Sequence, residues 1–301
     1  MIYDVSHRTI VRYTGPVRLA RFNLRLRPAP WPGQTLHDHE LLIDPAPASV
    51  QQAFGPWHVT RDRLAIGEPI QRLMVESRFT VEVAEPGFLL QTVPAPSVRQ
   101  IRAEALTHGG LDALAPSAYL YASSVARPSA VIADWARPML GDEAGVVAAG
   151  RALMAAIHAG FRYDAKATRT DTPPEEAFAK RRGVCQDFAH VMIVAARAHG
   201  IPAAYVSGYL RTLPPPGKPR LVGADAMHAW VALWCGEQLG WIGFDPTNDC
   251  LADASHIFVA MGRDYADVAP LDGVFHGGAE QSMDVAVDVI PRQAGEQVSA
   301  A

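Results

Sequence analysis

Three residues that lie far apart in the chain have side chains that together could act on an amide bond. Cys185 follows Gly183 at the start of a helical pattern, and His228 and Asp245 come later, in two strand-like segments. Unpaired N–H groups and the positive end of a helix dipole favour thiolate over thiol, so we expect Cys185 to be a nucleophile near neutral pH. A histidine within hydrogen-bond reach of the sulfur can move its proton, and a carboxylate can orient the ring.

In a Cys-His-Asp triad of this kind, the thiolate attacks a carbonyl carbon and the imidazolium donates its proton to the departing amine. Water or another amine then attacks the acyl-thioester. The backbone N–H of Cys185 is the natural first donor to the oxyanion, and the sequence identifies no second donor. The residues therefore predict an amide-cleaving cysteine enzyme, with His228 as general base and acid and Asp245 as the orienting carboxylate.

The register of two predicted strands brings His228 close to Asp245. A two-residue turn at Gly236-Glu237 would place Trp230 opposite Gly243 and His228 opposite Asp245. Directly opposed Cβ atoms in such a ladder are about 4.5–5.5 Å apart, which suits an imidazole-carboxylate hydrogen bond. Gly243 would also leave room for the indole, as one wall of a cleft. A bulge or a longer loop would break this register.

Other interpretations of these side chains compete with catalysis. Cysteine, histidine and aspartate can bind zinc, but a catalytic zinc site normally has closely spaced ligands, so we expect no metal and no other cofactor. Taken alone, His228 and Asp245 would be a structural pair on a sheet face. Cys235, at the predicted turn, and Cys250, in a predicted loop, have no nearby histidine and are expected to be incidental.

Several neighbouring residues are expected to be structural. Asp187 lies in the first turn of the helix, where the dipole favours a carboxylate, and His190 is expected to be a buried residue with its polar atoms satisfied. Trp230, Trp234 and Trp241 are most simply explained as core residues that pack against the same helix.

Composition places the chain among globular proteins, and the amide chemistry predicted above implies a protein or peptide substrate. Its 301 residues are 49% hydrophobic and 19% charged, with a formal net charge of -4, so no overall field favours nucleic acid or an anionic membrane. The polar, alternating N-terminus predicts no signal peptide, and no later stretch of eighteen uncharged apolar residues predicts a membrane span, so we expect a cytoplasmic protein. Three cysteines without a C-x-x-C pair are expected to be reduced. A homo-oligomer is left open.

The first hundred residues predict an N-terminal β domain. From Tyr3 to about Val83 the apolar residues recur at every second position, as in residues 3–13 and 75–83, and turn signals such as Trp31-Pro32-Gly33 separate these runs. This pattern indicates an antiparallel, sandwich-like domain over residues 1–100.

Residues 101–301 predict an α+β core. A helix is expected after Asp142 and closed by Gly160, and a second after a capping box at Thr172-Pro173-Pro174-Glu175. A third begins at Cys185 and runs to His199-Gly200. Strands are expected at 204–210, 227–234 and 240–244, which puts helices on an antiparallel sheet. Residues 280–290 alternate again and can add a strand to either domain, including the N-terminal one.

These segments resemble the transglutaminase-like core of papain-type cysteine enzymes. The resemblance lies in the run from Gly183 to His190, in Ala198-His199-Gly200-Ile201-Pro202-Ala203, in residues 206–210, in His228-Ala229-Trp230-Val231 and in residues 244–248. The N-terminal strands with residues 7–13 and the tail at residues 263–270 are similar to the bacterial branch of that family.

The resemblance implies the same triad of Cys185, His228 and Asp245, and it leaves the reaction open. The superfamily includes cross-linking enzymes, peptidases, amidases and proteins that have lost activity. Hydrolysis is the simpler expectation, because transfer requires an amine to outcompete water at the thioester. The alternative from another class is a catalytically silent binding or scaffold module on the same fold. No calcium-loop signature is present, so metal activation is not implied.

Overall fold

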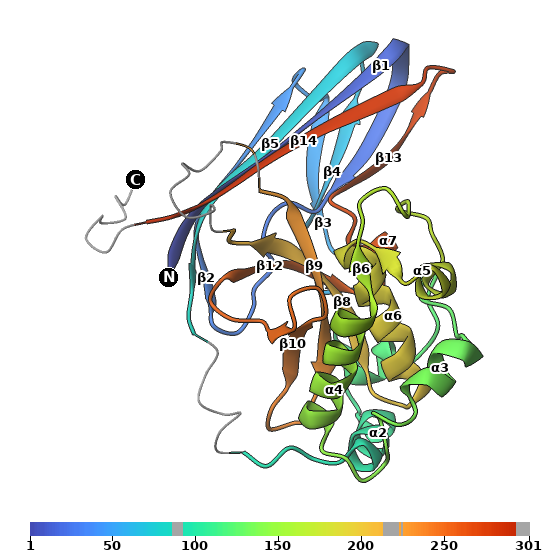
Figure 1. Cartoon of the computed structure of the whole chain (residues 1–301). Helices are drawn as coiled ribbons and strands as arrows, with labels where there is room; N and C mark the ends of the chain where they lie inside the picture. The colour runs from blue at the N-terminus through green and yellow to red at the C-terminus, as the bar shows by residue number, and fades with distance from the viewer. Residues whose placement is uncertain (86–92, 213–222, 224, 293–301) are drawn as a thin grey trace, which may run out of the picture.

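The computed structural model describes residues 1–85, 93–212, 223 and 225–292. The N-terminal residues and two strands from residues 271–291 together form a seven-stranded antiparallel sheet, here called the N-terminal sheet (Figure 1). Its strands are β1 (Ile2–Leu24), β2 (Gln34–Asp44), β3 (Ser49–Ala53), β4 (Arg61–Ile66), β5 (Ile70–Val83), β13 (Leu271–His276) and β14 (Gln281–Pro291). The alternation of apolar residues along β1 and β5 matches alternating burial, as expected for strands with one face on a core.

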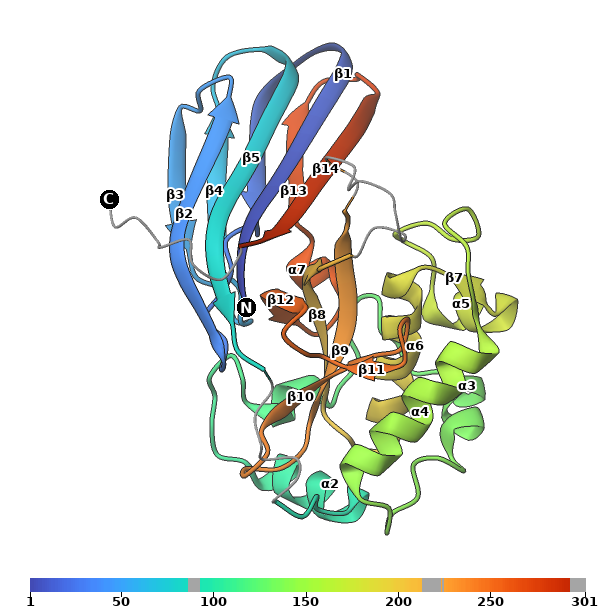
Figure 2. The same ribbon diagram turned by 60° about the vertical axis from the view of Figure 1, so that its left-hand side comes forward.

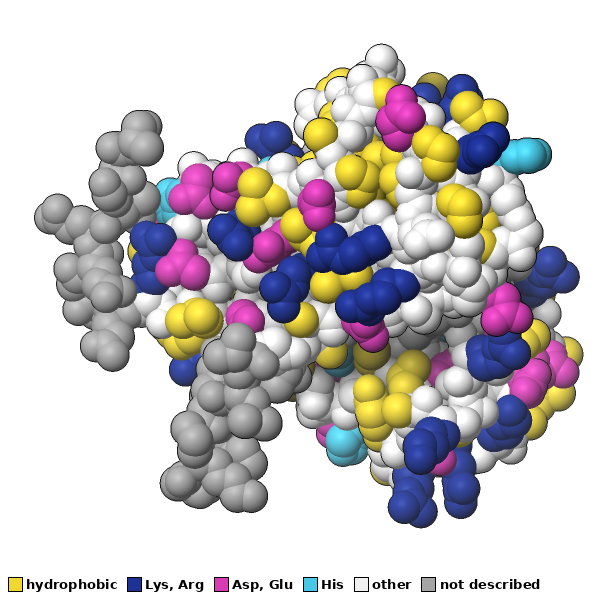
Figure 3. Space-filling model, turned by 90° about the horizontal axis from the view of Figure 1, so that it is seen from above, with side chains coloured by type: hydrophobic (Ala, Val, Ile, Leu, Met, Phe, Trp, Pro, Cys, Tyr) yellow, Lys and Arg dark blue, Asp and Glu magenta, His cyan; other side chains and the backbone are white. Residues whose placement is uncertain are grey.

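The long strand β1 organises this sheet. Its first half pairs with β5 on one side and with β14 on the other, and its second half pairs with β4 and β13. The chain thus returns to the N-terminal sheet at its end, as Figure 1 shows for the red strands beside the blue one. On the face that Figure 3 shows, Lys and Arg side chains are interspersed with Asp and Glu side chains. Ion pairs at the N-terminal sheet include Arg78–Glu76 at 2.9 Å and Arg292–Asp4 at 2.7 Å.

A second antiparallel sheet forms the core in the order β11-β10-β9-β8-β12. Its strands are β8 (Ala203–Leu210), β9 (Met227–Trp234), β10 (Trp241–Asp245), β11 (Cys250–Leu251) and β12 (His256–Gly262). The helices are α2 (Val98–Thr107), α3 (Ala130–Ala136), α4 (Val146–Gly160), α5 (Pro174–Lys180), α6 (Cys185–Ala198) and α7 (Tyr265–Val268), with a short pair of strands β6 (Arg162–Tyr163) and β7 (Arg182–Gly183). Helices α3 to α6 gather on one side of this sheet, and the N-terminal sheet lies on its other side (Figure 2).

Helix α6 is the centre of the core. Its residues from Gln186 to Ala196 are all buried, and the apolar ones share one cluster with β8 and β9 and with Tyr3, Val5 and Phe79 of the N-terminal sheet. Burial on this scale stabilises the element far more than helix propensity does. The nucleophile candidate is therefore attached to a helix that is buried along most of its length.

Two local expectations are wrong. Helix α5 begins at Pro174 without the predicted capping box, because the Thr172 hydroxyl accepts the Arg169 N–H at 2.8 Å and closes the preceding turn. Trp230 does not pack against α6. It packs with Tyr119, Phe258 and Met261 in a separate cluster, whereas Trp234 belongs to the cluster that contains α6.

The register predicted between β9 and β10 is also wrong. Trp241 pairs with Trp234 and Gly243 with Ala232, because the connection spans residues 235–240 in place of a two-residue turn. Gly236 and Gly240 have positive φ, at 96° and 64°, and close this loop. The predicted pairing is displaced by two positions along the strand, so each side chain keeps its face of the sheet.

Among the described residues, no helix is both long and apolar enough to cross a membrane.

Candidate active site

Cys185 is the first residue of α6 and is partly buried. The turn that leads into it is held by Asp187, whose Oδ2 accepts the backbone N–H of Val184 at 2.7 Å and the hydroxyl of Thr168 at 2.6 Å. A Cβ atom on Gly183 would lie 2.4 Å from the same oxygen. Gly183 is therefore required for space, and Asp187 fixes the start of the helix more directly than the dipole alone would suggest.

His228 and Asp245 meet on one face of the sheet. His228 Nε2 lies 2.7 Å from Asp245 Oδ2, and both side chains are buried. Because Nε2 is committed to the carboxylate, Nδ1 is the ring nitrogen left for the thiol. Burial opposes protonation of His228, but the hydrogen bonds and charges of Asp245 and Cys185 outweigh it and raise its pKa to about 10.

Asp245 is held by more than the histidine. Its Oδ1 accepts the backbone N–H groups of Thr247 at 2.9 Å and Asn248 at 3.2 Å, and its Oδ2 accepts the Asn248 amide at 2.6 Å. Burial opposes ionisation, but hydrogen bonds from His228, His256 and Asn248 keep the pKa of Asp245 well below its usual range. The carboxylate is thus ionised and fixed in orientation.

A second histidine, which the sequence reasoning did not single out, also reaches Asp245. His256 begins β12, and its Nε2 lies 3.3 Å from Asp245 Oδ2. Its pKa is raised to about 9, because hydrogen bonds to Asp245, Cys250 and Asp253 outweigh the effect of burial. The expectation that Cys250 lies in a loop with no nearby histidine is wrong, since Cys250 lies in β11 opposite Asp245 and hydrogen-bonds to His256. His256 could have been found from the sequence only by predicting the strand β12, which follows Asp245 in the chain, and its place in the sheet.

Within the part of the chain that the structure describes, His228, Asp245 and His256 form the group that could hold a metal ion. One ligand atom from each lies within 4.8 Å of the others. Hydrogen bonds already join these atoms, and a metal on His228 Nε2 would displace the proton that the carboxylate holds there. The geometry therefore favours acid–base chemistry over metal binding.

Trp230 lies beside the two histidines. Its ring stacks on that of His228 with 6.1 Å between centroids, and it is 5.3 Å from the ring of His256. A Cβ on Gly243 would approach Trp230 Nε1 to 3.1 Å, so the glycine gives the indole room although the two residues are not paired. Trp230 and His256 line a cavity of about 670 Å³ between the two sheets, together with Trp31, Trp241 and Phe258.

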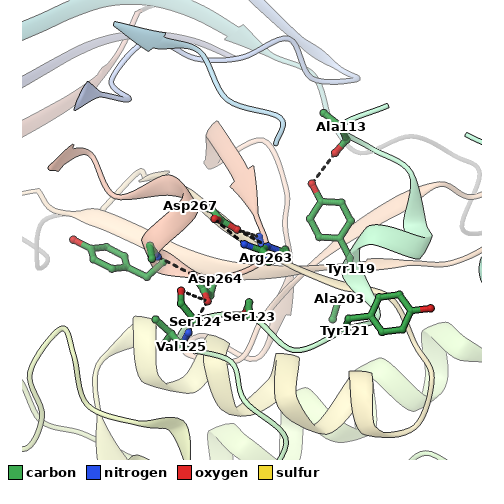
Figure 4. Close-up of polar contacts among 12 residues, drawn as sticks. Ala113, Tyr119, Tyr121, Ser123, Ser124, Val125, Ala203, Arg263, Asp264 and Asp267 are labelled. Carbon is green, nitrogen blue, oxygen red and sulfur yellow. Dashed lines mark hydrogen bonds and ion pairs between the residues drawn. The ribbon is translucent and has the colours of Figure 1, made fainter. Parts of the chain in front are cut away.

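The far end of α6 is anchored by the segment after β12. The Arg197 guanidinium donates to the carbonyl groups of Arg263 at 2.6 Å and Ala203 at 2.8 Å. Asp264 accepts the Ser124 hydroxyl and the Val125 N–H, and Arg263 pairs with Asp267 (Figure 4). Residues 263–270, which are similar to the bacterial branch of the family, thus help to hold the C-terminal end of α6 in place.

His190, about one and a half helical turns after Cys185, also connects α6 to the segment after β12. Its Nε2 accepts the Tyr265 N–H at 3.2 Å, and its ring lies 5.0 Å from that of Tyr205. Burial lowers the pKa of His190 to about 4. His190 is thus a buried and satisfied histidine, as the sequence predicts, and its low pKa makes it neutral near pH 7. Gln186 is also committed, since its amide donates to the Thr170 carbonyl at 2.9 Å.

The family comparisons match both parts of the chain. Residues 133–246 match the model of the transglutaminase-like superfamily, and residues 3–82 match that of the bacterial transglutaminase-like N-terminal region. The first range contains Cys185, His228 and Asp245.

Similar proteins extend this result. An uncharacterised protein of Mycobacterium tuberculosis is 37% identical over 96% of this chain and 92% of its own length. A protein-glutamine gamma-glutamyltransferase of Pseudomonas aeruginosa is 41% identical over 105 residues, which are 32% of this chain and 16% of that protein. The crystal structure of a candidate cysteine protease from Cytophaga hutchinsonii has a TM-score of 0.70 at 21% identity, over 97% of this chain and 92% of that one. This likeness confirms the predicted fold class.

Proposed function

The chain belongs to the transglutaminase-like superfamily, and its fold is similar to that of a candidate cysteine protease. We propose that it acts on amide bonds of proteins or peptides through an acyl-thioester on Cys185. The observation that carries the proposal is the hydrogen bond of 2.7 Å between His228 and Asp245, beside a cysteine at a helix start. This contact supports the proposal because Cys185 hydrogen-bonds to the same histidine, and the reaction needs a nucleophile, a proton carrier and an orienting carboxylate together.

The first half-reaction uses these groups in sequence. The Cys185 thiolate attacks the carbonyl carbon and forms the S–C bond, and the oxyanion lies at the N–H groups that begin α6. The His228 imidazolium then gives its proton to the amide nitrogen, the C–N bond breaks, and the amine leaves. The acyl group remains on sulfur, with His228 neutral and Asp245 still ionised.

The second half-reaction reverses the proton transfer. Neutral His228 takes a proton from water or from an amine while that molecule attacks the thioester carbon. The S–C bond breaks, and the thiolate and imidazolium are restored. Water gives a carboxylic acid, and an amine gives a new amide. Hydrolysis is the simpler outcome, whereas the likeness of 105 residues to a glutamyltransferase supports transfer from a glutamine side chain.

One incubation distinguishes the two outcomes. The protein is mixed with a glutamine-containing peptide and a labelled primary amine, with the Cys185→Ala variant as control. Incorporation of label means transfer, and ammonia or a shortened peptide without label means hydrolysis. The Cys185→Ala variant should give neither product, and equal activity of that variant would refute the proposal.

Selective alkylation separates the enzyme from a silent scaffold. Cys235 is buried and burial raises its pKa, so it serves as an internal slow thiol. We expect iodoacetamide to label Cys185 faster than Cys235 and Cys250 at mildly acidic pH. Three equal and slow rates would favour a binding module built on the same fold.

A further inference from the structure

The carboxylate of Asp245 serves two histidines at once. His228 Nε2 and His256 Nε2 approach the same oxygen, Oδ2, at 2.7 Å and 3.3 Å, and the two ring centroids are 6.2 Å apart. The remaining contacts of Asp245 come from Thr247 and Asn248, which hold it independently of either ring. A change at His256 can therefore alter the electrostatics of the triad without releasing the carboxylate.

His256 is placed between two carboxylates. Its Nδ1 lies 3.0 Å from Asp253 Oδ1, while its Nε2 faces Asp245, and its side chain is 3% exposed. The backbone N–H of Asp253 also points at Nδ1, at 3.1 Å, but the carboxylate is the stronger partner because its hydrogen bond is assisted by charge. A ring with a carboxylate at each nitrogen is stabilised as an imidazolium, in agreement with its pKa of about 9.

The other groups around His256 do not cancel this charge. Cys250 of β11 is a hydrogen-bonding neighbour, Trp230 of β9 presents its ring at 5.3 Å, and Leu210 of β8 pairs with His256 across the sheet. The next residue along the chain from β8, Arg211, donates its backbone N–H to Ser255. His228 is thus the titratable group that shares a partner with His256.

On the basis of the proposed function, we propose that His256 is a positioning residue that acts through Asp245: as an imidazolium it occupies part of the carboxylate and limits how tightly His228 holds its proton. Two physical effects act in the same direction. The positive charge of His256 repels a second positive charge across the buried site, and its N–H competes for the oxygen that His228 uses.

This restraint matters for proton transfer. His228 must give its proton to the leaving amine and then take one from the attacking molecule, and general acid–base catalysis is best when the affinity for the proton is neither too high nor too low. With Asp245 alone, His228 would retain its proton more strongly. His256 therefore makes the same histidine a better acid without touching the substrate.

The proposal can be tested by proton NMR titration of the histidine rings in the full-length Cys185→Ser protein, which removes the thiolate from the titration. Signals are assigned with His228→Gln and His256→Gln. In the His256→Gln variant, we expect the midpoint of His228 to rise by about one pH unit, a tenfold gain in proton affinity. An unchanged or lower midpoint, or a His256 ring that is neutral at pH 7 in the parent protein, would overturn the proposal.

A second variant keeps the test decisive if His256→Gln does not fold. Asp253→Asn retains the ring and removes one of its carboxylates, so the titration midpoint of His256 should fall. A larger share of His256 is then neutral when His228 titrates, so the midpoint of His228 should rise. A merely structural role of His256 would lower the melting temperature and leave the midpoint of His228 in place.

The NMR result does not depend on turnover, so it separates this proposal from the proposed function. If the titration midpoint of His228 shifts in a protein that has no amide-cleaving activity, only the proposed function is refuted. In an active enzyme assayed near pH 7, His256→Gln should lower kcat more than it changes KM, because the proton is released less readily.

Discussion

His228 Nε2 lies 2.7 Å from Asp245 Oδ2, although the two residues do not face each other across the strand ladder. The last pair between β9 and β10 is Phe244 with Val231, so continuing the ladder by one residue sets Asp245 opposite Trp230. His228 is the diagonal neighbour on the same face, and diagonal side chains of this length can still meet. The contact between His228 and Asp245 thus depends on the face of the sheet more than on direct pairing.

Neutralising the carboxylate should reduce catalysis without a comparable loss of fold. In Asp245→Asn, the ring of His228 loses its charged partner and its tautomer is no longer fixed, so we expect kcat to fall by about 10²–10⁴-fold. The measurement is steady-state turnover of the substrate found in the amine-incorporation assay. Asp249→Asn, an exposed change in the same turn, is the matched control and should keep kcat within about twofold. A fully active Asp245→Asn enzyme would contradict the triad.

Adding a methyl group before the nucleophile should disturb the start of α6. In Gly183→Ala the new Cβ would lie 2.4 Å from Asp187 Oδ2, so the carboxylate must leave Val184 and Thr168. We expect a loss of about 1–3 kcal/mol in the free energy of unfolding, as for overpacked sites.

Urea unfolding checks this value, and slower alkylation of Cys185 should accompany it. Gly141→Ala is the control, because nothing lies within 4 Å of its added Cβ. Equal stability of the two variants would show that Asp187 is not needed to hold the turn.

Acid should weaken the contact between the two sheets through His7. Its Nδ1 lies 2.9 Å from the Tyr209 hydroxyl, and burial lowers its pKa to about 4 from 6.5. As pH falls from 6.5 to 4, the His7 ring therefore binds a proton in the unfolded chain before it does so in the folded protein. The free energy of unfolding decreases over this range by up to about 1.4 kcal/mol per pH unit.

The free energy of unfolding, measured in urea at several pH values, tests this dependence. His7→Gln should show a shallower loss between pH 6.5 and 4, whereas exposed His276→Gln should keep the slope of the parent protein. Parallel curves for His7→Gln and the parent would contradict the assignment. His190, with a pKa of about 4, should contribute in the same direction.

Chelation should leave the activity unchanged. The hydrogen bonds of His228, Asp245 and His256 satisfy the atoms that would ligate a metal, so the proposed reaction uses no ion. Turnover before and after dialysis against EDTA is the measurement, with elemental analysis of the same samples. A loss of turnover that zinc restores would instead favour a zinc enzyme with these three ligands.

The amino-acid sequence by itself determined which chemistry is available and most of the elements that carry it. The glycine break before Cys185 starts a helix where predicted, and the strand at Met227–Trp234 has the predicted bounds. Periodicity reports which face of a strand is apolar, and a register displaced by two residues leaves that face unchanged. For this reason His228 and Asp245 could be assigned to one face from a pairing that was wrong.

Only the tertiary structure decided what surrounds these groups. The loop at residues 235–240, the second histidine on Asp245 and the approach of Asp187 to Gly183 depend on contacts between separate elements. His256 reaches Asp245 from another strand, and local patterns contain no information about that distance. Sequence patterns fix local conformation and the face on which a side chain lies, whereas distances between distant side chains follow from the packing of whole elements around a shared core.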